Sequence, residues 1–353
     1  MATNNGCVTP SAATRSSALL RRRLPLFLLV LPGLLAAGCD NTQSALNPKG
    51  PPAANIAMIW WIMFTISAAI FAVVVATLLY ALHRRREPAT ETLERRPVDR
   101  KTRTIGLVWV IASGAILLGM LAMDVRSNQF QSVAPSPVVF TLQVIGHDWW
   151  WEFNYLNSGV TTANEAHIPV GRPVAISGES ADVIHSFWVP ELNGKLDLIP
   201  GHTNTMWMQA DYPGVYRGQC AEYCGDDHGL MALHIVADPA EQFAVWLNGQ
   251  RQPAATPQDP AALVGMNGFP SSACAGCHTI RGTKAGGNRA PDLTHVGSRR
   301  YIAAGTLENS PENLIRWISD PQGVKQGNFM PYLGLDPNSE FVRSTAAYLW
   351  NLK

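Results

Sequence analysis

Two long apolar stretches lie in the first half of the chain, which has 353 residues. Residues 56–82 and residues 104–123 contain no charged side chain. A helix of about 20 apolar residues is long enough to cross the hydrocarbon core of a bilayer. The pattern therefore predicts a transmembrane helical hairpin over residues 50–130. A buried hairpin of a soluble protein is the alternative, which the lengths and the flanking charge disfavour.

Basic side chains cluster between the two apolar stretches. They are Arg84, Arg85, Arg86, Arg95, Arg96, Arg100, Lys101 and Arg103. Loops rich in Lys and Arg remain on the cytoplasmic side of a membrane. We therefore expect this loop in the cytoplasm and both ends of the hairpin on the outer side.

The N-terminal segment has the features of an export signal. Three arginines at 21–23 precede the apolar residues 24–35, and Ala36-Ala-Gly-Cys39 follows. This order is typical of a signal peptide, which we predict over residues 1–39. Its end resembles a lipoprotein cleavage box, and the resemblance implies a lipid on Cys39. An uncleaved or differently cleaved signal is the alternative.

Apolar and polar residues alternate through much of the middle of the chain. The alternating segments, separated by Gly and Pro turns, include residues 139–145, 172–177, 205–209 and 231–236. A period of two residues is typical of strands with one buried face. The pattern predicts an antiparallel β-sandwich or barrel over residues 137–238. A linker follows over residues 239–261, with a short amphipathic piece at 243–247 and then a run rich in Pro, Gln and Ala.

Helical signals mark the C-terminal part, residues 262–353. Ser310 followed by Pro311 has the pattern of a helix start, and Pro321 ends that helix. A closing helix is expected over residues 339–352. Its predicted apolar face comprises Phe341, Thr345, Tyr348, Leu349 and Leu352. We therefore predict a small all-α domain at this end of the chain.

Length, charge and cysteine content limit the classes of protein. A chain of this length favours two or three domains. The 27 Lys and Arg against 26 Asp and Glu leave a formal net charge of +1, which gives no reason to expect a nucleic-acid partner. The six cysteines are Cys7, Cys39, Cys220, Cys224, Cys274 and Cys277. We expect no structural disulfide, because each of the last five lies in a sequence motif that favours another assignment.

Residues 220–231 combine two thiols, an imidazole and a thioether. Thiolate and thioether are soft ligands that favour copper, whereas structural zinc would not normally take the methionine. The strand expected after Met231 places these ligands on a loop between strands. One loop rarely completes such a site, and His185 is the upstream candidate. A disulfide between Cys220 and Cys224 is the alternative.

His185 together with the motif Cys-x-Glu-x-Cys-x-x-x-His-x-x-Met resembles the binuclear copper centre of cytochrome c oxidase subunit II. The resemblance implies a cupredoxin fold, in which the copper ligands lie at one end of the sandwich. It also implies that Cys220 and Cys224 bridge two coppers. The remaining implied ligands are His185 and Met231 at one copper, and His228 and the Glu222 carbonyl at the other.

The same resemblance implies roles for residues near the copper ligands. The Glu222 carboxylate would bind magnesium at the boundary with subunit I, and a simple ion pair is the alternative. Asp182 would orient the region around His185. Trp149, in the cluster Trp149-Trp-Trp151, would lie near the copper and accept electrons from cytochrome c. The alternative is that it only packs, which is the interpretation we favour for Trp150 and Trp151.

A second cofactor motif lies in Cys274-Ala-Gly-Cys277-His278. The spacing Cys-x-x-Cys-His is the signature of covalent haem c attachment, in which the histidine ligates iron. A bare redox or zinc pair is disfavoured by the adjacent histidine. Met330, within Gly327-Asn-Phe-Met-Pro331, resembles the axial methionine of class I cytochromes c. His and Met ligation is typical of haems that transfer electrons at relatively high potential.

The two motifs together resemble subunit II of a haem-copper oxidase with a fused cytochrome c, over about residues 50–353. The resemblance implies that electrons pass from an external donor, expected to be a cytochrome, through haem c and the copper pair to subunit I. There oxygen is reduced to water with coupled proton translocation. This chain itself has no catalytic acid, base or nucleophile that we identify. We expect it in a bacterial plasma membrane, with both cofactor domains on the outer face.

Similar copper motifs also occur in proteins with other functions. A copper-containing nitric oxide reductase subunit and a membrane-tethered electron carrier are the alternatives, and nitrous oxide reductase usually lacks the helical hairpin. A quinol-oxidase subunit would dispense with the copper ligands. The sequence departs from the family pattern at Arg103. At this position the family often has a glutamate that is thought to help protons enter the enzyme. That role is in doubt in this chain.

Overall fold

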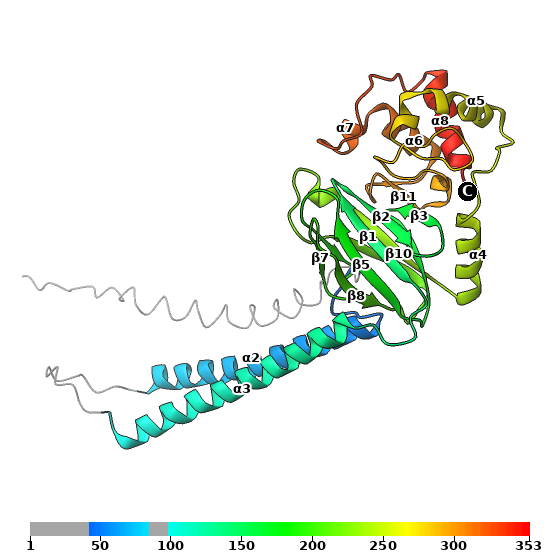
Figure 1. Cartoon of the computed structure of the whole chain (residues 1–353). Coiled ribbons are helices and arrows are strands. Elements are labelled where there is room, and N and C mark those ends of the chain that lie inside the picture. The colour runs from blue at the N-terminus through cyan, green and yellow to red at the C-terminus, as the bar shows by residue number, and fades with distance from the viewer. Residues whose placement is uncertain (1–41, 85–97) are drawn as a thin grey trace, which may run out of the picture. The chain divides into compact units, whose positions relative to one another are not determined.

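The computed structural model describes residues 42–84 and 98–353. The predicted signal over residues 1–39, the lipid site Cys39 and most of the basic loop lie outside the described residues. Residues 43–353 group into one unit by their contacts. Figure 1 labels the main helices and strands along the chain.

Two helices form the predicted apolar hairpin. They are α2, Pro51–His83, and α3, Arg100–Ser132, and both are long and apolar enough to cross a membrane. Each extends beyond the apolar stretch, because proline suits the first turn of α2 and the Asp99 side chain caps α3 by accepting the Thr102 N–H. The helices contact one another and run side by side (Figure 1). The Trp207 indole donates to the Phe130 carbonyl at 2.7 Å, which joins α3 to the domain that follows.

That domain, which we call the β-domain, is a sandwich of two five-stranded sheets. One sheet has the order β3-β2-β1-β5-β8 and the other the order β4-β10-β9-β6-β7. The strands are β1 Thr141–His147, β2 Trp150–Tyr155, β3 Val160–Ala163, β4 Glu165–Pro169, β5 Val174–Ser180, β6 His185–Trp188, β7 Leu196–Leu198, β8 Asn204–Met208, β9 Gly214–Cys220 and β10 Ala232–Asp238. The prediction of a sandwich over residues 137–238 agrees with this architecture.

The strand pairing is not purely antiparallel, so the prediction was wrong in this respect. Strand β1 pairs with β5 in parallel, and β10 pairs with β4 in parallel. Parallel neighbours need a long crossover between them, and here other strands form that crossover. Alternation of apolar and polar residues predicts which face is buried, but it does not predict which strands become neighbours.

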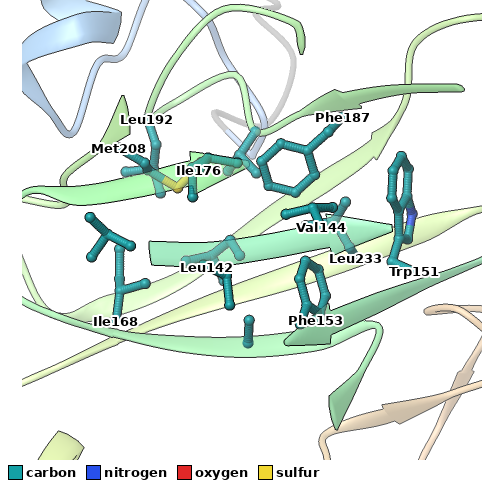
Figure 2. Close-up of a cluster of buried hydrophobic side chains, with 14 of the residues drawn as sticks. Leu142, Val144, Trp151, Phe153, Ile168, Ile176, Phe187, Leu192, Met208 and Leu233 are labelled. Atoms are coloured by element: carbon teal, nitrogen blue, oxygen red, sulfur yellow. The ribbon is translucent and has the colours of Figure 1, made fainter. Parts of the chain in front are cut away.

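The core of the β-domain lies between the two sheets. Strand β1 alternates between buried and half-buried residues, and Leu142 and Val144 are fully enclosed. Figure 2 shows them against Phe153, Ile176 and Phe187 from other strands. The period of two residues read from the sequence therefore corresponds to the buried face of the sheet.

Part of the predicted linker is helical. Helix α4, Ala240–Gln250, is longer than the amphipathic piece expected at residues 243–247. Phe243 is buried and its ring stacks on Phe140, with ring centroids 5.6 Å apart. Helix α4 therefore belongs to the β-domain, and the connection to the next domain is shorter than the predicted linker of residues 239–261.

The C-terminal domain, residues 260–353, is mainly helical. Its helices are α5 Pro260–Gly268, α6 Pro311–Ser319, α7 Pro321–Val324 and α8 Glu340–Asn351. Shorter elements are the 3-10 segments η2 Phe269–Ser271, η3 Ala273–Gly276 and η4 Val296–Ser298, and a two-stranded sheet of β11 Tyr301–Ile302 and β12 Leu307–Glu308. The Ser310 hydroxyl caps α6, as the residue pattern predicted, and the Ser339 hydroxyl caps α8.

Helices α5 and α8 cross closely at Gly265. A Cβ atom at Gly265 would lie 2.1 Å from the Ser344 carbonyl oxygen, so only glycine allows this approach. Thr345, Tyr348 and Leu349, three residues of the predicted apolar face, are buried in the contact region of α8. Residue size at one position thus decides how the closing helix packs.

We expect Gly265→Ala to destabilise the C-terminal domain by about 1–3 kcal/mol, because the added methyl group overpacks the crossing. Hydrogen exchange of the α8 amides, followed by mass spectrometry on the full-length protein in detergent, measures this effect. Gly268→Ala is the matched control, since a Cβ there meets no atom within 4 Å. Equal exchange of α8 in the two variants would contradict the prediction.

Candidate metal and haem sites

The loop of residues 220–231, which we call the copper loop, connects the end of β9 to the start of β10. The Cys220 N–H donates to the Met231 carbonyl at 3.0 Å, so the two ends of the loop lie side by side. A single 3-10 turn, η1 His228–Leu230, lies just before Met231. Gly225 takes a positive φ of 110°, which lets the chain turn beneath the Trp149 ring.

Strand pairing brings His185 to this loop. His185 is the first residue of β6, and β6 pairs with β9 so that Phe187 lies opposite Cys220. His185, two residues away on the same strand face, therefore comes beside the cysteine. The two segments are 35 positions apart in the sequence.

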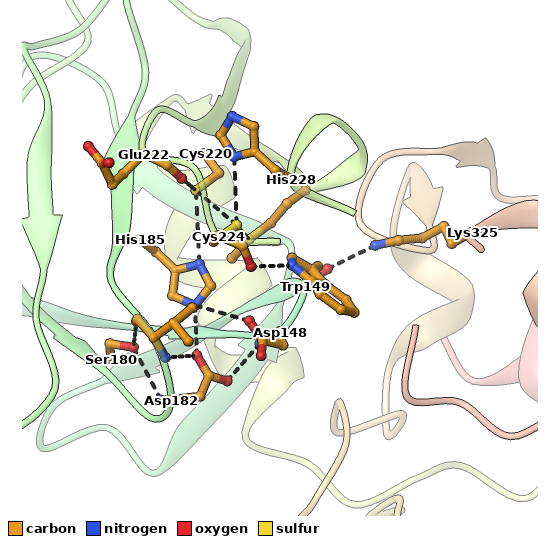
Figure 3. Close-up of polar contacts among 12 residues, drawn as sticks. Asp148, Trp149, Ser180, Asp182, His185, Cys220, Glu222, Cys224, His228 and Lys325 are labelled. Atoms are coloured by element: carbon orange, nitrogen blue, oxygen red, sulfur yellow. Dashed lines mark hydrogen bonds and ion pairs between the residues drawn. The ribbon is translucent and has the colours of Figure 1, made fainter. Parts of the chain in front are cut away.

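The six predicted copper ligands converge, and Figure 3 shows His185, Cys220, Glu222, Cys224 and His228 among them. The measured separations are 3.7 Å between the two cysteine sulfurs, 3.9 Å from Cys220 Sγ to His185 Nδ1, 3.6 Å from Cys224 Sγ to His228 Nδ1, 3.9 Å from Cys224 Sγ to Met231 Sδ and 3.2 Å from Cys220 Sγ to the Glu222 carbonyl oxygen.

These separations are close to those between ligands of a metal, with the two of 3.9 Å slightly longer and the one of 3.2 Å slightly shorter. Sulfur and nitrogen atoms bound tetrahedrally to a first-row metal at about 2.0–2.3 Å lie about 3.5–3.8 Å from one another. The cysteine sulfurs are much further apart than the roughly 2.05 Å of a disulfide. Because thiolate and thioether are soft donors, the set suits copper.

Burial and hydrogen bonds control the charges of this site. Burial disfavours a charged His185 ring, but the Asp182 carboxylate and Cys220 outweigh it and raise the pKa of His185 to about 9. The hydrogen bond from the Cys224 thiol lowers the pKa of Cys220, and the same interaction raises the pKa of Cys224. At neutral pH the protein thus holds one thiolate beside a protonated His185 ring in a nearly enclosed place, and a bound soft cation would replace the ring proton as the partner of the thiolate.

Asp182 connects the histidine ligand to the neighbouring strand. Its Oδ1 lies 2.8 Å from His185 Nε2, which leaves Nδ1 directed at Cys220. Its Oδ2 accepts the Asp148 N–H at 2.7 Å. A carboxylate that fixes a ligand histidine orients the ring and increases its basicity. The contact agrees with the orienting role that the resemblance implied for Asp182.

The three tryptophans have different surroundings. The Trp149 indole donates to the Cys224 carbonyl at 2.7 Å, and Trp149 is only 8% exposed. Trp151 is buried and its indole reaches the Met231 carbonyl at 3.3 Å. Trp150 stacks on His147, with ring centroids 4.2 Å apart. Trp149 and Trp151 therefore both touch the copper loop, whereas Trp150 does not hydrogen-bond to it among the described residues.

The Glu222 carboxylate is exposed, and in Figure 3 it points away from the copper ligands. Within residues 42–84 and 98–353, no ion pair to Glu222 is found. The side chain is therefore accessible to a cation or to another subunit, while the carbonyl of the same residue faces Cys220.

The haem motif lies on η3 and the residues that follow it. Cys274 and Cys277 form no disulfide among the described residues. His278 Nδ1 donates to the Pro291 carbonyl at 2.8 Å, since a carbonyl can only accept, and this leaves Nε2 available to iron. Burial lowers the pKa of His278, which keeps the ring neutral. The tautomer and the charge are those that an iron ligand needs.

Buried polar atoms in the C-terminal domain also fit a haem. Arg299 is 9% exposed, and its Nε finds no hydrogen-bond partner among the described residues. The Asn309 amide oxygen is likewise buried and unpaired in this part of the chain. The haem carboxylates are anions, and a buried guanidinium with a free N–H is suited to bind one.

Met330 follows α7, and hydrogen bonds to its backbone N–H and carbonyl fix its position. The Met330 N–H donates to the Asn328 side chain at 2.8 Å, and the Gln322 amide donates to the Met330 carbonyl at 3.0 Å. No hydrogen bond joins Met330 to residues 274–278 within the described ranges. Met266, the other methionine near the motif, packs against the core of the domain.

Sequence reasoning missed the residues that cover Trp149. The Lys325 ammonium donates to the Trp149 carbonyl at 2.9 Å, and the Phe329 ring lies 5.4 Å from the Trp149 ring. Both residues belong to the C-terminal domain. Their role depends on how two domains dock, so no local pattern in the sequence indicates it.

Comparison with known proteins identifies the two cofactor domains. Residues 158–238 match the family model of the periplasmic domain of cytochrome c oxidase subunit II, and residues 244–353 match that of cytochrome c. Cytochrome c oxidase subunit 2 of Alkalihalophilus pseudofirmus is 37% identical over 344 residues, which cover 94% of this chain and 97% of the relative.

Two further relatives match shorter regions. Cytochrome c oxidase subunit 2 of Bacillus sp. (strain PS3) is 32% identical over 259 residues, which cover 70% of this chain and 71% of the relative. The crystal structure of the periplasmic domain of cytochrome oxidase subunit II from Bradyrhizobium japonicum is 30% identical. It covers 34% of this chain and 97% of that chain, with a TM-score of 0.33.

We expect Asp182→Ala to weaken copper binding by roughly 10–100-fold, because the ring of His185 loses the carboxylate that orients it. Competition titration of copper against a chelator, on the full-length protein, measures the affinity. Asp226→Ala is the control, since Asp226 is an exposed carboxylate of the same loop. If both variants bind copper equally well, Asp182 does not support the site.

Proposed function

The chain belongs to the cytochrome c oxidase subunit II family, and from this premise we propose that it conducts electrons to oxidase subunit I through a haem c and a binuclear copper centre. The convergence of six ligand atoms at the copper loop is the observation that carries the proposal. When bound, each cofactor takes up and releases one electron at a time. The protein supplies placement and tuning of potential.

In the proposed copper centre, the thiolates of Cys220 and Cys224 would be shared by two coppers. His185 and Met231 would complete the ligands of one copper, and His228 with the Glu222 carbonyl would complete those of the other. The burial of His185 and Met231, which are 0% exposed, supports this role. An apolar surrounding limits water access and thereby sets the potential of a metal site.

In the proposed haem site, thioether bonds from Cys274 and Cys277 hold the porphyrin. His278 and Met330 would be the two iron ligands that the protein supplies. The hydrogen bond from His278 to the Pro291 carbonyl supports this assignment, because it orients the ring and leaves Nε2 free. The unpaired Arg299 N–H supports binding of a haem carboxylate.

Two further roles extend the resemblance. Trp149 accepts electrons on their way to the copper pair, which its hydrogen bond to the Cys224 carbonyl supports. The Glu222 carboxylate binds magnesium at the boundary with subunit I, since a hard carboxylate suits this ion. The exposure of that carboxylate supports the second role.

The proposed location is a bacterial plasma membrane. The basic loop between α2 and α3 lies in the cytoplasm, and the β-domain and C-terminal domain lie on the outer face. Residues 1–39 direct export, and Cys39 carries the lipid. An external cytochrome donates electrons to the haem, and subunit I reduces oxygen to water with proton translocation.

The test is spectroscopy of the full-length protein in detergent, matured with haem and loaded with copper. We expect a low-spin haem c spectrum and a mixed-valence signal from two coppers in electron paramagnetic resonance. Cys224→Ser is expected to abolish the two-copper signal and leave the haem spectrum unchanged, because one bridging thiolate is lost. A mononuclear copper signal in the natural protein would overturn the copper assignment.

A second measurement tests the oxidase role. The chain, purified from its own membrane with its associated subunits, is expected to show haem of subunit I and oxygen uptake. A tethered carrier would be purified without either, and a nitric oxide reductase would consume nitric oxide instead. Either result contradicts the proposed function.

We expect Met330→Leu to convert the haem from low spin to high spin, because leucine cannot ligate iron. The covalent attachment remains, since Cys274 and Cys277 are unchanged. Optical spectra of the purified variant measure the spin state. Met266→Leu is the matched control, with a methionine removed from the same domain; a spin change in this variant alone would identify Met266 as the ligand.

A further inference from the structure

A buried lysine of the C-terminal domain reaches into the β-domain. Lys325 is 3% exposed, and its ammonium donates to the Trp149 carbonyl at 2.9 Å (Figure 3). Long cationic side chains are rarely enclosed unless a partner satisfies them. Among the described residues, the hydrogen-bond acceptor of Lys325 comes from the other domain, so the ammonium is satisfied while the two domains are docked.

The segment that contains Lys325 also contains Met330. We call residues 325–330 the methionine segment. Within it, the Phe329 ring lies 5.4 Å from the Trp149 ring at an interplanar angle of 38°. A Cβ added to Gly327 would lie 3.3 Å from Asp226 of the copper loop. The methionine segment therefore touches both Trp149 and the copper loop.

These contacts form a continuous connection between the two cofactor sites. Met330 lies one residue from Phe329, which contacts the Trp149 ring. The Trp149 indole in turn donates to the carbonyl of Cys224, a proposed bridging ligand. The Lys325 ammonium donates to the Trp149 carbonyl and so holds the backbone of the tryptophan at the same contact.

Charges around Lys325 favour its ammonium form. Burial lowers the pKa of Lys325 to about 8, and the negative charge of Asp227 opposes that decrease. Asp227 is 2% exposed, and one of its carboxylate oxygens has no hydrogen-bond partner among the described residues. At neutral pH the lysine therefore carries its positive charge within the interface.

The two domains also meet at a second place. The Arg300 N–H donates to the Glu165 carboxylate at 2.9 Å, and the Tyr301 ring stacks on His234 with centroids 4.3 Å apart. The Ala232 N–H donates to the Ala304 carbonyl at 3.0 Å. Loss of the Lys325 contact therefore leaves the domains joined and releases only the methionine segment.

We propose that Lys325 is a positioning residue that holds the methionine segment against Trp149, so that electrons cross from the C-terminal domain to the copper loop at this contact. The proposal rests on the proposed function. One electron leaves the ferrous haem, which becomes ferric, and the copper pair is reduced by one electron. The step breaks no bond and moves no proton.

A consequence concerns the external donor. Trp149 is 8% exposed and is covered by Lys325 and Phe329, so a soluble cytochrome has no direct access to its ring. Electrons from such a donor therefore reach the haem first. Trp149 receives them from within the same chain.

The experiment compares variants of the full-length protein loaded with haem and copper. Lys325→Met removes the donor and keeps the aliphatic stem, whereas Lys325→Arg keeps donors and charge. Lys284→Met removes an exposed lysine of the same domain and is the control. Flash reduction of the haem, followed optically, measures the rate at which the copper pair oxidises it, and hydrogen exchange measures the mobility of residues 325–330.

We expect Lys325→Met to slow the transfer roughly tenfold or more, since a small misplacement of reacting groups has a large effect on rate. Exchange in the methionine segment rises, while the haem spectrum and the copper signal remain those of the natural protein. Lys325→Arg keeps most of the rate, and Lys284→Met keeps all of it.

An unchanged rate of electron transfer in Lys325→Met would overturn the proposal. Loss of the haem spectrum or of the copper signal in that variant would also overturn it, because Lys325 would then be needed for the haem site or the copper site itself. If Lys325→Met does not fold, Phe329→Ala provides the same test, because Phe329 is 74% exposed and its removal leaves no cavity in the core. Absence of either cofactor signal in the natural protein would instead refute the proposed function.

Discussion

The pairing of strand β6 with strand β9 is the interaction on which the proposed copper site depends. It places His185 beside Cys220, although the two residues are 35 positions apart in the chain. The hydrogen bond from Cys220 to Met231 closes the copper loop and brings the other ligands to the same point. The core packed between the two sheets fixes the positions of the strands from which the ligands extend. A soft, enclosed ligand set follows from the register of one strand pair.

Around the ligands, hydrogen bonds connect the site to the rest of the β-domain. Asp182 holds the His185 ring and also accepts the backbone N–H of Asp148, next to Trp149. The Trp149 indole binds the Cys224 carbonyl. The histidine ligand, the tryptophan and the copper loop are therefore parts of one network. Such networks orient metal ligands and tune them, so the polar residues near the site have a function beyond packing.

The C-terminal domain is docked onto the β-domain through specific contacts at two places. One is the contact of Lys325 and Phe329 with Trp149, and the other involves Glu165 and His234 of the β-domain. Fusion of a haem-binding domain to a copper-binding domain raises the local concentration of one near the other. Specific docking adds orientation to this proximity. The chain thus combines a cytochrome c domain and an oxidase subunit II domain into one defined arrangement.

The sequence by itself determined the features that depend on local pattern or on ligand chemistry. Apolar length predicted the helical hairpin, residue alternation predicted the sandwich, and Ser310 and Ser339 marked helix starts. The spacing of Cys220, Cys224, His228 and Met231 indicated a soft metal site, because few ions suit those donors. The tertiary structure alone decided the parallel pairing of β1 with β5, the inclusion of α4 in the β-domain and the burial of Lys325 against Trp149. These features depend on contacts between distant segments, and the free energy of such contacts is not contained in any local stretch of residues.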